Sequence, residues 1–317
     1  MPKLLLVKTS SLGDVVHTLP VASDVRAVLP DAEIAWVVED TLAAIPRLHP
    51  AVARVIPVAI RRWRSALWRR EIRDEVRRFR DTLRDTEYDA VIDSQGLLKS
   101  AFIARAARGS RYGLDWKSAR EPLAIFYDRT FSVPWGEHAV ERNRSLAAQA
   151  LGYAIPARVD YGIRAEPGRF AWLPPEHYAV LLHATSASEK LWPEASWRTL
   201  GERLHKRGMR CVLPWGSDPE RERSERLAAG ILDAVVPPAL PLAEAAPLLA
   251  GARAVIGVDT GLTHLAAALG RPTVGIYFAT DPAATGLYGS ARAANTGTVG
   301  RLPSADDVLS ALDRLGT

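Results

Sequence analysis

The segment 254–281 constrains the fold more than any other, because strand-like and helix-like patterns alternate within it. An apolar run at 254–258 has the length and β-branched content of a buried strand. The polar turn 259–261 interrupts this run, and apolar residues then recur at helical spacing over 262–269. A second strand-like run follows at 273–278. The order strand, turn, helix, strand predicts an α/β fold with a parallel sheet.

The turn 259–261 is predicted to lie where a strand ends and a helix begins. Ligands bind at this edge of open α/β sheets, and the free amides of the helix suit phosphate or hydroxyl oxygens. The alternative is an ordinary βαβ unit in which Asp259 or Thr260 only caps the helix. His264 favours a ligand site, because an apolar residue would serve the core equally well there. We therefore predict ligand contacts from Asp259, Thr260, Gly261 and His264.

Length and composition favour a soluble protein of two domains. The chain has 317 residues, of which 48% are hydrophobic and 24% are charged. No apolar run reaches the length of a membrane span, and the chain starts on a strand without a signal-peptide pattern. Cys211 is the single cysteine, and no Cys/His cluster has zinc-site spacing. We expect a cytoplasmic protein without a disulfide or a bound metal.

The first half of the chain places polar turns after two further strand-like runs, 4–7 and 88–92, and the turn after the second run begins at residue 93 and extends to 100. The run 4–7 leads into a turn that contains Ser10, Ser11, Gly13 and Asp14, and a helical pattern follows. A carboxylate at a helix start is favoured in its ionised form and can accept a proton from a substrate hydroxyl. The alternative is that Asp14 only caps the helix. The turn is not a P-loop, because it lacks the required glycine and lysine spacing.

The segment 61–84 has the pattern of one long amphipathic helix with an arginine-rich face. Such a face is usually solvated, but Trp63 and Trp68 beside the arginines favour an anionic, partly lipidic partner at a membrane surface. Nucleic acid ranks lower, because the positive charge is local and no recognition motif accompanies it.

The second half repeats the pattern of polar turns after strands. After a strand-like run at 178–183, Thr185, Ser186 and Lys190 form a set suited to a diphosphate, although a lone lysine is more often a surface residue. Glu220 is equally compatible with contacts to ribose hydroxyls and with a first-turn helix charge. We place the interdomain linker at 156–174, where turn residues are frequent.

Two Rossmann-like halves that face each other define the GT-B architecture. We expect an acceptor-binding domain at 1–160, a nucleotide-sugar-binding domain at 175–302, and a helix at 303–317 that packs back toward the first domain. Four motifs carry a family resemblance: KTSSLGDVVHTLP at 8–20, HATSASEKLWP at 183–193, LPWGSDPERER at 213–223 and GVDTGLTHLAAALGRPTVGIYFATDP at 257–282. Together they resemble the ADP-heptose:lipopolysaccharide heptosyltransferases, glycosyltransferase family 9. The resemblance runs through nearly the whole chain.

The resemblance implies a role for each candidate site residue. Asp14 matches the family's general base. The positions that match donor-binding residues are Thr185, Ser186, Lys190, Glu220, Leu240, Asp259, Thr260, Gly261 and His264; Ser186 stands where a second threonine is common. The acceptor-binding candidates, which the motifs define less well, are Ser10, Ser11, Gly13, Arg61, Arg62, Arg64, Arg120 and Arg142.

The resemblance further implies an inverting transfer of heptose from ADP-heptose to the Kdo of Kdo-lipid A, in synthesis of the lipopolysaccharide inner core. The expected enzyme needs no cofactor or metal and works at the cytoplasmic face of the inner membrane as a peripheral protein. It contacts an anionic membrane surface and no nucleic acid. Three alternatives stay open: an enzyme that adds the second heptose, another ADP-heptose transferase, and a non-catalytic protein that binds a nucleotide-sugar.

Overall fold

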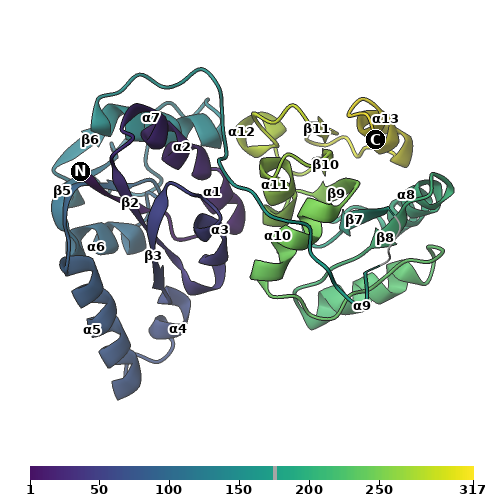
Figure 1. Cartoon of the computed structure of the whole chain (residues 1–317), viewed down its shortest axis with the longest axis horizontal. Coiled ribbons are helices and arrows are strands. Elements are labelled where there is room, and N and C mark those ends of the chain that lie inside the picture. The colour runs from purple at the N-terminus through teal and green to yellow at the C-terminus, as the bar shows by residue number, and fades with distance from the viewer. Residues whose placement is uncertain (174–176) are drawn as a thin grey trace. The chain divides into compact units, whose positions relative to one another are not determined.

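The protein divides into two compact units, Met1–Ile163 and Arg164–Thr317 (Figure 1). The computed structural model describes residues 1–173 and 177–317. The division falls within the segment predicted as the linker, 156–174. Residues 174 and 175, where we expect the linker to end and the second domain to begin, lie outside the described residues.

The first unit is built on a six-stranded parallel sheet in the order β3-β2-β1-β4-β5-β6. The chain adds β2 and β3 on one side of β1 and then β4 on the other side, so the strand order reverses between β1 and β4. Ligands bind at such a switch point in open α/β sheets. The strands are β1 (Lys3–Val7), β2 (Glu33–Glu39), β3 (Val52–Val58), β4 (Glu87–Asp93), β5 (Arg108–Leu114) and β6 (Arg129–Phe131).

Helices cover both faces of this sheet, with α5 and α6 on one side and α2 and α7 on the other (Figure 1). The core on the α5–α6 side contains Leu5, Val7 and Val91 of the strands with Leu83 and Ala101 of the helices. The helical elements are α1 (Leu12–Val16), α2 (Leu19–Val28), η1 (Asp40–Leu42), α3 (Ala44–Arg47), α4 (Ile60–Arg64), α5 (Arg70–Arg84), α6 (Leu98–Ala106), η2 (Ala124–Phe126) and α7 (Ala139–Leu151).

The prediction of one continuous helix over 61–84 is wrong. The segment forms two helices, α4 and α5, joined by a turn. A continuous helix would separate Trp63 from Phe79 by roughly 24 Å at 1.5 Å per residue. In the hairpin the two rings meet with centroids 5.3 Å apart, and the Trp63 indole nitrogen donates to Glu75 Oε2 at 2.9 Å. Folding back thus buries an aromatic surface that a straight helix would leave in water, and the turn carries the exposed Leu67 and Trp68.

The second unit has a five-stranded parallel sheet in the order β11-β10-β9-β7-β8. Here the strand order reverses between β7 and β9. The strands are β7 (Tyr178–Leu182), β8 (Arg210–Val212), β9 (Ala254–Val258), β10 (Thr273–Ile276) and β11 (Ala293–Thr296). The helices are η3 (Ser188–Lys190), α8 (Glu194–Lys206), α9 (Asp218–Ala228), α10 (Leu242–Gly251), α11 (Gly261–Ala268), α12 (Pro282–Thr285) and α13 (Ala305–Asp313).

The last helix, α13, packs against α8, β10 and β11 of the second unit, and its packing toward the first domain stays a prediction. Its apolar face is complementary to the core of the second unit. Val308, Leu309 and Leu312 complete the core around Trp197. In addition, the Trp192 indole nitrogen donates to the Pro303 carbonyl oxygen at 3.0 Å and fixes the segment that leads into the helix.

Within residues 1–173 and 177–317, no helix combines the length and the apolar character needed to cross a membrane.

Candidate functional site

The switch point of the second unit brings the predicted donor-site residues together around Asp259. Asp259 follows β9 directly, and Lys190 comes from the turn after β7. The Lys190 Nζ atom donates to Asp259 Oδ2 at 2.6 Å, and the Thr280 hydroxyl donates to the same oxygen at 2.8 Å. His264 Nε2, one turn into α11, lies 3.3 Å from Asp259 Oδ1. One carboxylate therefore orients three polar side chains.

This arrangement keeps Asp259 ionised. Burial alone would raise the pKa of the carboxyl group, but hydrogen bonds from His264, Lys190 and Thr280 outweigh burial and hold the pKa well below its ordinary value. The Asp259 side chain is 11% exposed and that of Lys190 is 24% exposed, so water screens the pair only partly. The cluster is a fixed electrostatic element at the amino end of α11.

The helix start beside Asp259 is open to a ligand. Thr260 is the N-cap of α11 in extended geometry, and its side chain makes no capping hydrogen bond. The first amides of the helix, from Gly261 onward, therefore point out of the helix end and favour an anion. The Thr185 hydroxyl reaches the Asp259 carbonyl oxygen at 3.4 Å, which links the two loops, and Ser186 is exposed.

Two predicted donor residues lie apart from this hydrogen-bonded cluster. Glu220 is in the first turn of α9, where its Oε2 atom accepts from the Gly216 amide at 2.7 Å. It therefore stabilises the loop that leads into its own helix. Leu240 is half-buried in the segment that precedes α10. The contacts of Glu220 and Leu240 with a nucleoside stay predictions.

In the first unit, the predicted base Asp14 lies in the first turn of α1, directly after β1. Its Oδ2 atom accepts two hydrogen bonds from Ser11, one from the amide and one from the hydroxyl, both at 2.8 Å. No described residue donates to Oδ1, so this oxygen can take a proton. Asp14 is thus both a cap and a candidate base; the two interpretations do not exclude each other.

Residues after β4 hold the loop of the predicted base, as the switch-point geometry requires. Gln95 Oε1 accepts from the amides of Thr9 and Ser10 at 3.0 and 3.1 Å. Lys99 Nζ donates to the Ser10 hydroxyl oxygen at 2.8 Å. Sequence reasoning identified the turn 93–100 as polar but assigned no role to Gln95 or Lys99. Their position after the strand next to β1 is the signal that would have found them.

Beneath this loop lies a buried ionic group that sequence reasoning missed. Lys8 Nζ donates to the Ser94 carbonyl oxygen at 2.8 Å, and Tyr127 donates to Asp93 Oδ2 at 2.8 Å. Burial lowers the pKa of Lys8, while the charges of Asp14 and Asp93 act in the opposite direction. Burial raises the pKa of Asp93.

Thr280 in the second unit was not predicted as a site residue either, although it follows β10.

Arg142, one of the predicted acceptor arginines, is held in place by neighbours within the first unit. Its Nη2 atom donates to the Ser118 carbonyl oxygen at 2.8 Å, and its guanidinium lies 3.9 Å from the centroid of the Trp135 ring. Its Nη1 atom is buried without a hydrogen-bond partner. Burial and then the charge of Arg120 lower the pKa of Arg142. A pair of cations with an unused donor suits a carboxylate or phosphate.

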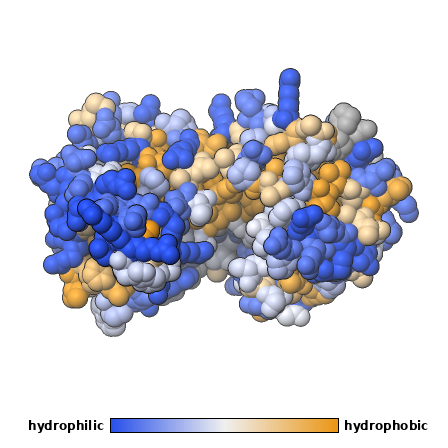
Figure 2. All heavy atoms as spheres, turned by 90° about the horizontal axis from the view of Figure 1, so that it is seen from below, coloured by the Kyte–Doolittle hydropathy of each residue, from blue (hydrophilic) through white to orange (hydrophobic). Residues whose placement is uncertain are grey.

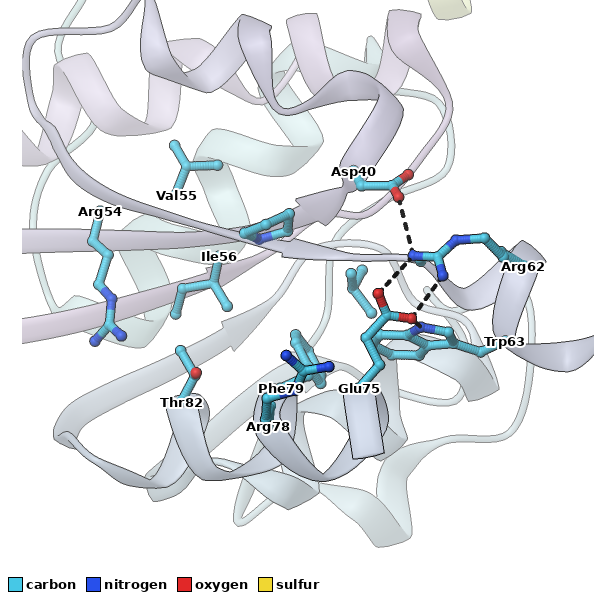
Figure 3. A pocket seen from close by; sticks show the side chains of 13 residues that line it. Asp40, Arg54, Val55, Ile56, Arg62, Trp63, Glu75, Arg78, Phe79 and Thr82 are labelled. Atoms are coloured by element: carbon cyan, nitrogen blue, oxygen red, sulfur yellow. Dashed lines mark hydrogen bonds and ion pairs between the residues drawn. The ribbon is translucent and has the colours of Figure 1, made fainter. Parts of the chain in front are cut away.

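The three arginines of α4 have different surroundings. Arg62 binds Glu75 in a bidentate ion pair at 2.7 and 3.0 Å and lies 3.7 Å from Asp40 (Figure 3). It therefore holds α4 against α5, which differs from its predicted role in acceptor binding. Arg61 and Arg64 are exposed on the short helix. Figure 2, which views the molecule from below, shows this end of the first unit, the left half of the picture, as largely hydrophilic.

A pocket of about 440 Å³ lies between β3 and the α4–α5 hairpin (Figure 3). Its lining is mixed, with Ile56, Trp63 and Phe79 beside Arg54 and Arg78. The Arg62–Glu75 pair closes one side of it.

No group of three or more His, Cys, Asp and Glu residues in the described part of the chain is arranged to hold a metal ion.

Comparisons with known proteins identify the family of the chain. The family model described as glycosyltransferase family 9 (heptosyltransferase) matches residues 76–309. The chain belongs to glycosyltransferase family 9. The lipopolysaccharide heptosyltransferase 1 of Pseudomonas aeruginosa is 55% identical over 290 residues, which cover 90% of this chain and 81% of that protein. The protein of the same name from Escherichia coli K12 is 49% identical over 292 residues, which cover 90% and 91%.

Solved structures extend the likeness of this family 9 enzyme to the fold. The structure titled E. coli heptosyltransferase WaaC with ADP has a TM-score of 0.90 and 44% identity, and 99% of each chain is covered. The structure of E. coli ADP-heptose lps heptosyltransferase II has a TM-score of 0.79 but only 21% identity, with 99% and 98% covered. The predicted family, the glycosyltransferase activity and the GT-B fold with two Rossmann-like units are confirmed.

Proposed function

We propose that this family 9 enzyme moves L-glycero-D-manno-heptose from ADP-heptose to the Kdo of Kdo-lipid A during synthesis of the lipopolysaccharide inner core. The observation that carries the proposal is the high identity, over 90% of the chain, with two proteins named lipopolysaccharide heptosyltransferase 1. The proposed donor is supported by similarity to a structure titled E. coli heptosyltransferase WaaC with ADP-2-deoxy-2-fluoro heptose, with a TM-score of 0.85, 44% identity and coverage of 98% and 99%.

Asp14 is the general base in this proposal. Its Oδ1 atom takes the proton from the Kdo hydroxyl as that oxygen attacks the anomeric carbon of heptose. One displacement inverts the anomeric centre, so one base suffices. The two bonds from Ser11 to Oδ2 support this role, because they fix the orientation of the carboxylate. A base so positioned contributes about 10²- to 10⁴-fold to the rate.

The Asp259 cluster serves the leaving group. ADP gains negative charge as the glycosidic bond breaks, and Lys190 with the first amides of α11 stabilises that charge in place. Asp259 acts by orienting Lys190, His264 and Thr280. Thr185 and Ser186 complete the diphosphate loop, and Glu220 and Leu240 contact the nucleoside. The positive charge needed for departure comes from the chain itself, so we propose that the transfer uses no divalent cation or other cofactor.

The acceptor binds to cations of the first unit. Arg142, whose Nη1 atom is unused, and Arg120 hold a carboxylate of Kdo. Arg61 and Arg64 meet phosphates of the lipid, with Arg62 as the clamp that holds their helix. The loop residues Ser10, Ser11 and Gly13 line the acceptor hydroxyl. The enzyme works as a peripheral protein at the cytoplasmic face of the inner membrane, supported by the arginine-rich hairpin with its exposed Leu67 and Trp68.

A turnover assay with two acceptors tests the proposal. The enzyme is given ADP-heptose with Kdo-lipid A or with its heptosylated product, and ADP release is followed. We expect ADP release and heptose transfer with Kdo-lipid A only. Turnover only with the heptosylated core would assign the enzyme to the second heptose instead. ADP-heptose binding without turnover on either acceptor would favour a non-catalytic nucleotide-sugar protein.

A further inference from the structure

The first unit carries an exposed apolar patch on α6 and η2. We define the apolar patch as Leu98 and Phe102 of α6 with Ile125 of η2. These side chains are 46%, 56% and 84% exposed, respectively. Leu98 and Phe102 are four residues apart on one helix and therefore share a face. Single exposed apolar residues are common, but three large ones on two packed elements require an explanation.

The patch is a built feature of the fold. η2 packs against α6, and the rings of Phe102 and Phe126 meet edge to face with centroids 5.2 Å apart. The Leu98 amide, the start of α6, donates to Glu121 Oε2 at 2.6 Å. These contacts fix the two elements that present the patch, so its side chains are exposed without loss of order in the backbone that carries them.

Cations border the patch. Arg105 follows Phe102 by three residues on the same helix stripe, and it is exposed. Arg84 reaches the end of α6, where its Nε atom donates to the Ala106 carbonyl oxygen at 3.3 Å. Lys99 is the residue after Leu98. The neighbouring carboxylate, Glu121, is engaged with the start of α6. Apolar side chains beside cations match the interface of an anionic bilayer, where apolar groups enter the acyl boundary and cations meet the headgroups.

The apolar patch lies beside the turn of the predicted base, because Lys99 connects the two. Lys99, beside Leu98, donates to the Ser10 hydroxyl, and Asp14 lies in the same loop. A bilayer bound to this face therefore lies next to the turn that contains Ser10 and the predicted base.

We propose that the apolar patch of α6 and η2 anchors the enzyme to an anionic bilayer, next to the loop of the predicted base. This inference deepens the proposed function and rests on it for the acceptor alone. It assigns the apolar anchor to a surface separate from the arginine-rich hairpin, which supplies charge.

Vesicle sedimentation tests the anchor without any turnover. The probe is vesicles of phosphatidylethanolamine with phosphatidylglycerol. The variant is Leu98→Ser with Ile125→Ser, and the matched control is Leu232→Ser with Val299→Ser, two exposed apolar residues of the second unit. We expect vesicle binding by the patch variant to be about tenfold weaker or more, because the transfer of each apolar side chain from water into the bilayer is favourable and the variant loses it. The control should bind like the wild type, and thermal unfolding should be unchanged in both.

Turnover then separates this inference from the proposed function. The patch variant should lose activity on Kdo-lipid A in vesicles but keep wild-type activity on a deacylated, water-soluble acceptor. Absence of turnover on both acceptors in the wild type would contradict the proposed function and leave the sedimentation result standing. Wild-type vesicle binding by the patch variant would overturn the anchor. So would a loss of binding only in Leu67→Ser with Trp68→Ser, or a wild-type dimer that the patch substitutions dissociate.

Discussion

Replacement of Asp259 by asparagine probes the carboxylate at the centre of the predicted donor site. The change keeps the shape of the side chain but removes its charge. In the wild type, Oδ2 accepts from Lys190 and Thr280, and Oδ1 lies next to His264. The amide of asparagine offers one accepting oxygen only, so its NH₂ group faces either His264 or the donors Lys190 and Thr280. Lys190 loses its counter-charge and its fixed orientation.

The expected size of the effect follows from these contacts. A hydrogen bond to a charged group contributes about 1.5–3 kcal/mol. The Lys190–Asp259 pair is largely buried, so this range applies without the heavy screening of a surface pair. At about 1.4 kcal/mol per tenfold, Asp259→Asn should lower kcat/KM for ADP-heptose roughly 10- to 150-fold.

A double-mutant cycle with Lys190→Met distinguishes an orienting role from an independent one. Steady-state kinetics on the two single variants and the double variant give the coupling energy. We expect coupling above about 1 kcal/mol, since Asp259 acts through Lys190. Additive losses within about 0.5 kcal/mol would refute the reasoning, as would a kcat/KM for Asp259→Asn close to that of the wild type.

Three further predictions concern the pH dependence of stability, the α4–α5 hairpin and the absence of a metal requirement. His49 accepts from the Ala51 amide through Nδ1 and is buried, which lowers its pKa to about 4. Because the unfolded chain takes up the proton first, stability falls from pH 6.5 toward 4, and between pH 7 and 5 the wild type should lose about 2 kcal/mol more than His49→Gln in urea unfolding. Equal losses would contradict this. Glu75→Gln should loosen α4 and raise KM for the acceptor about two- to fivefold, with KM for the donor unchanged in the same assay. Turnover should be insensitive to a chelator of divalent cations; inactivation that Mg²⁺ reverses would show that a metal takes part.

Much of the fold was predictable, because parallel strands followed by polar turns leave a local pattern. The segments after β1, β7 and β9 contain Asp14, Lys190 and Asp259, which the sequence singled out, and each segment lies at a switch point. The end of the first helix of the arginine-rich segment was missed, although the spacing holds a signal for it. At 3.6 residues per turn, Trp63 and Phe79 lie about 160° apart on a continuous helix, so the two rings meet only if the chain folds back into a hairpin. The packing of α13 depends on which core its apolar face fits, and spacing does not report this.

The supporting residues of the site were harder to predict than its central ones. Gln95 and Lys99 act on Thr9 and Ser10, which are distant in sequence, and only the pairing of β1 with β4 brings them together. The same holds for Thr280, which reaches Asp259 because β10 pairs with β9. For Arg62, the sequence suggested a ligand contact but did not reveal a partner within the fold. Its charge suggested an anionic ligand, whereas Glu75, thirteen residues later, neutralises it within the fold.

The central claim is that a carboxylate of the first unit activates the acceptor while the second unit binds the donor. The most direct measurement is transfer by Asp14→Asn, with ADP-heptose binding determined by calorimetry on the same preparation. We predict donor affinity within about twofold of the wild type and a loss of kcat of about 10²-fold or more. Transfer at the wild-type rate, or a loss explained by weaker donor binding, would contradict the account.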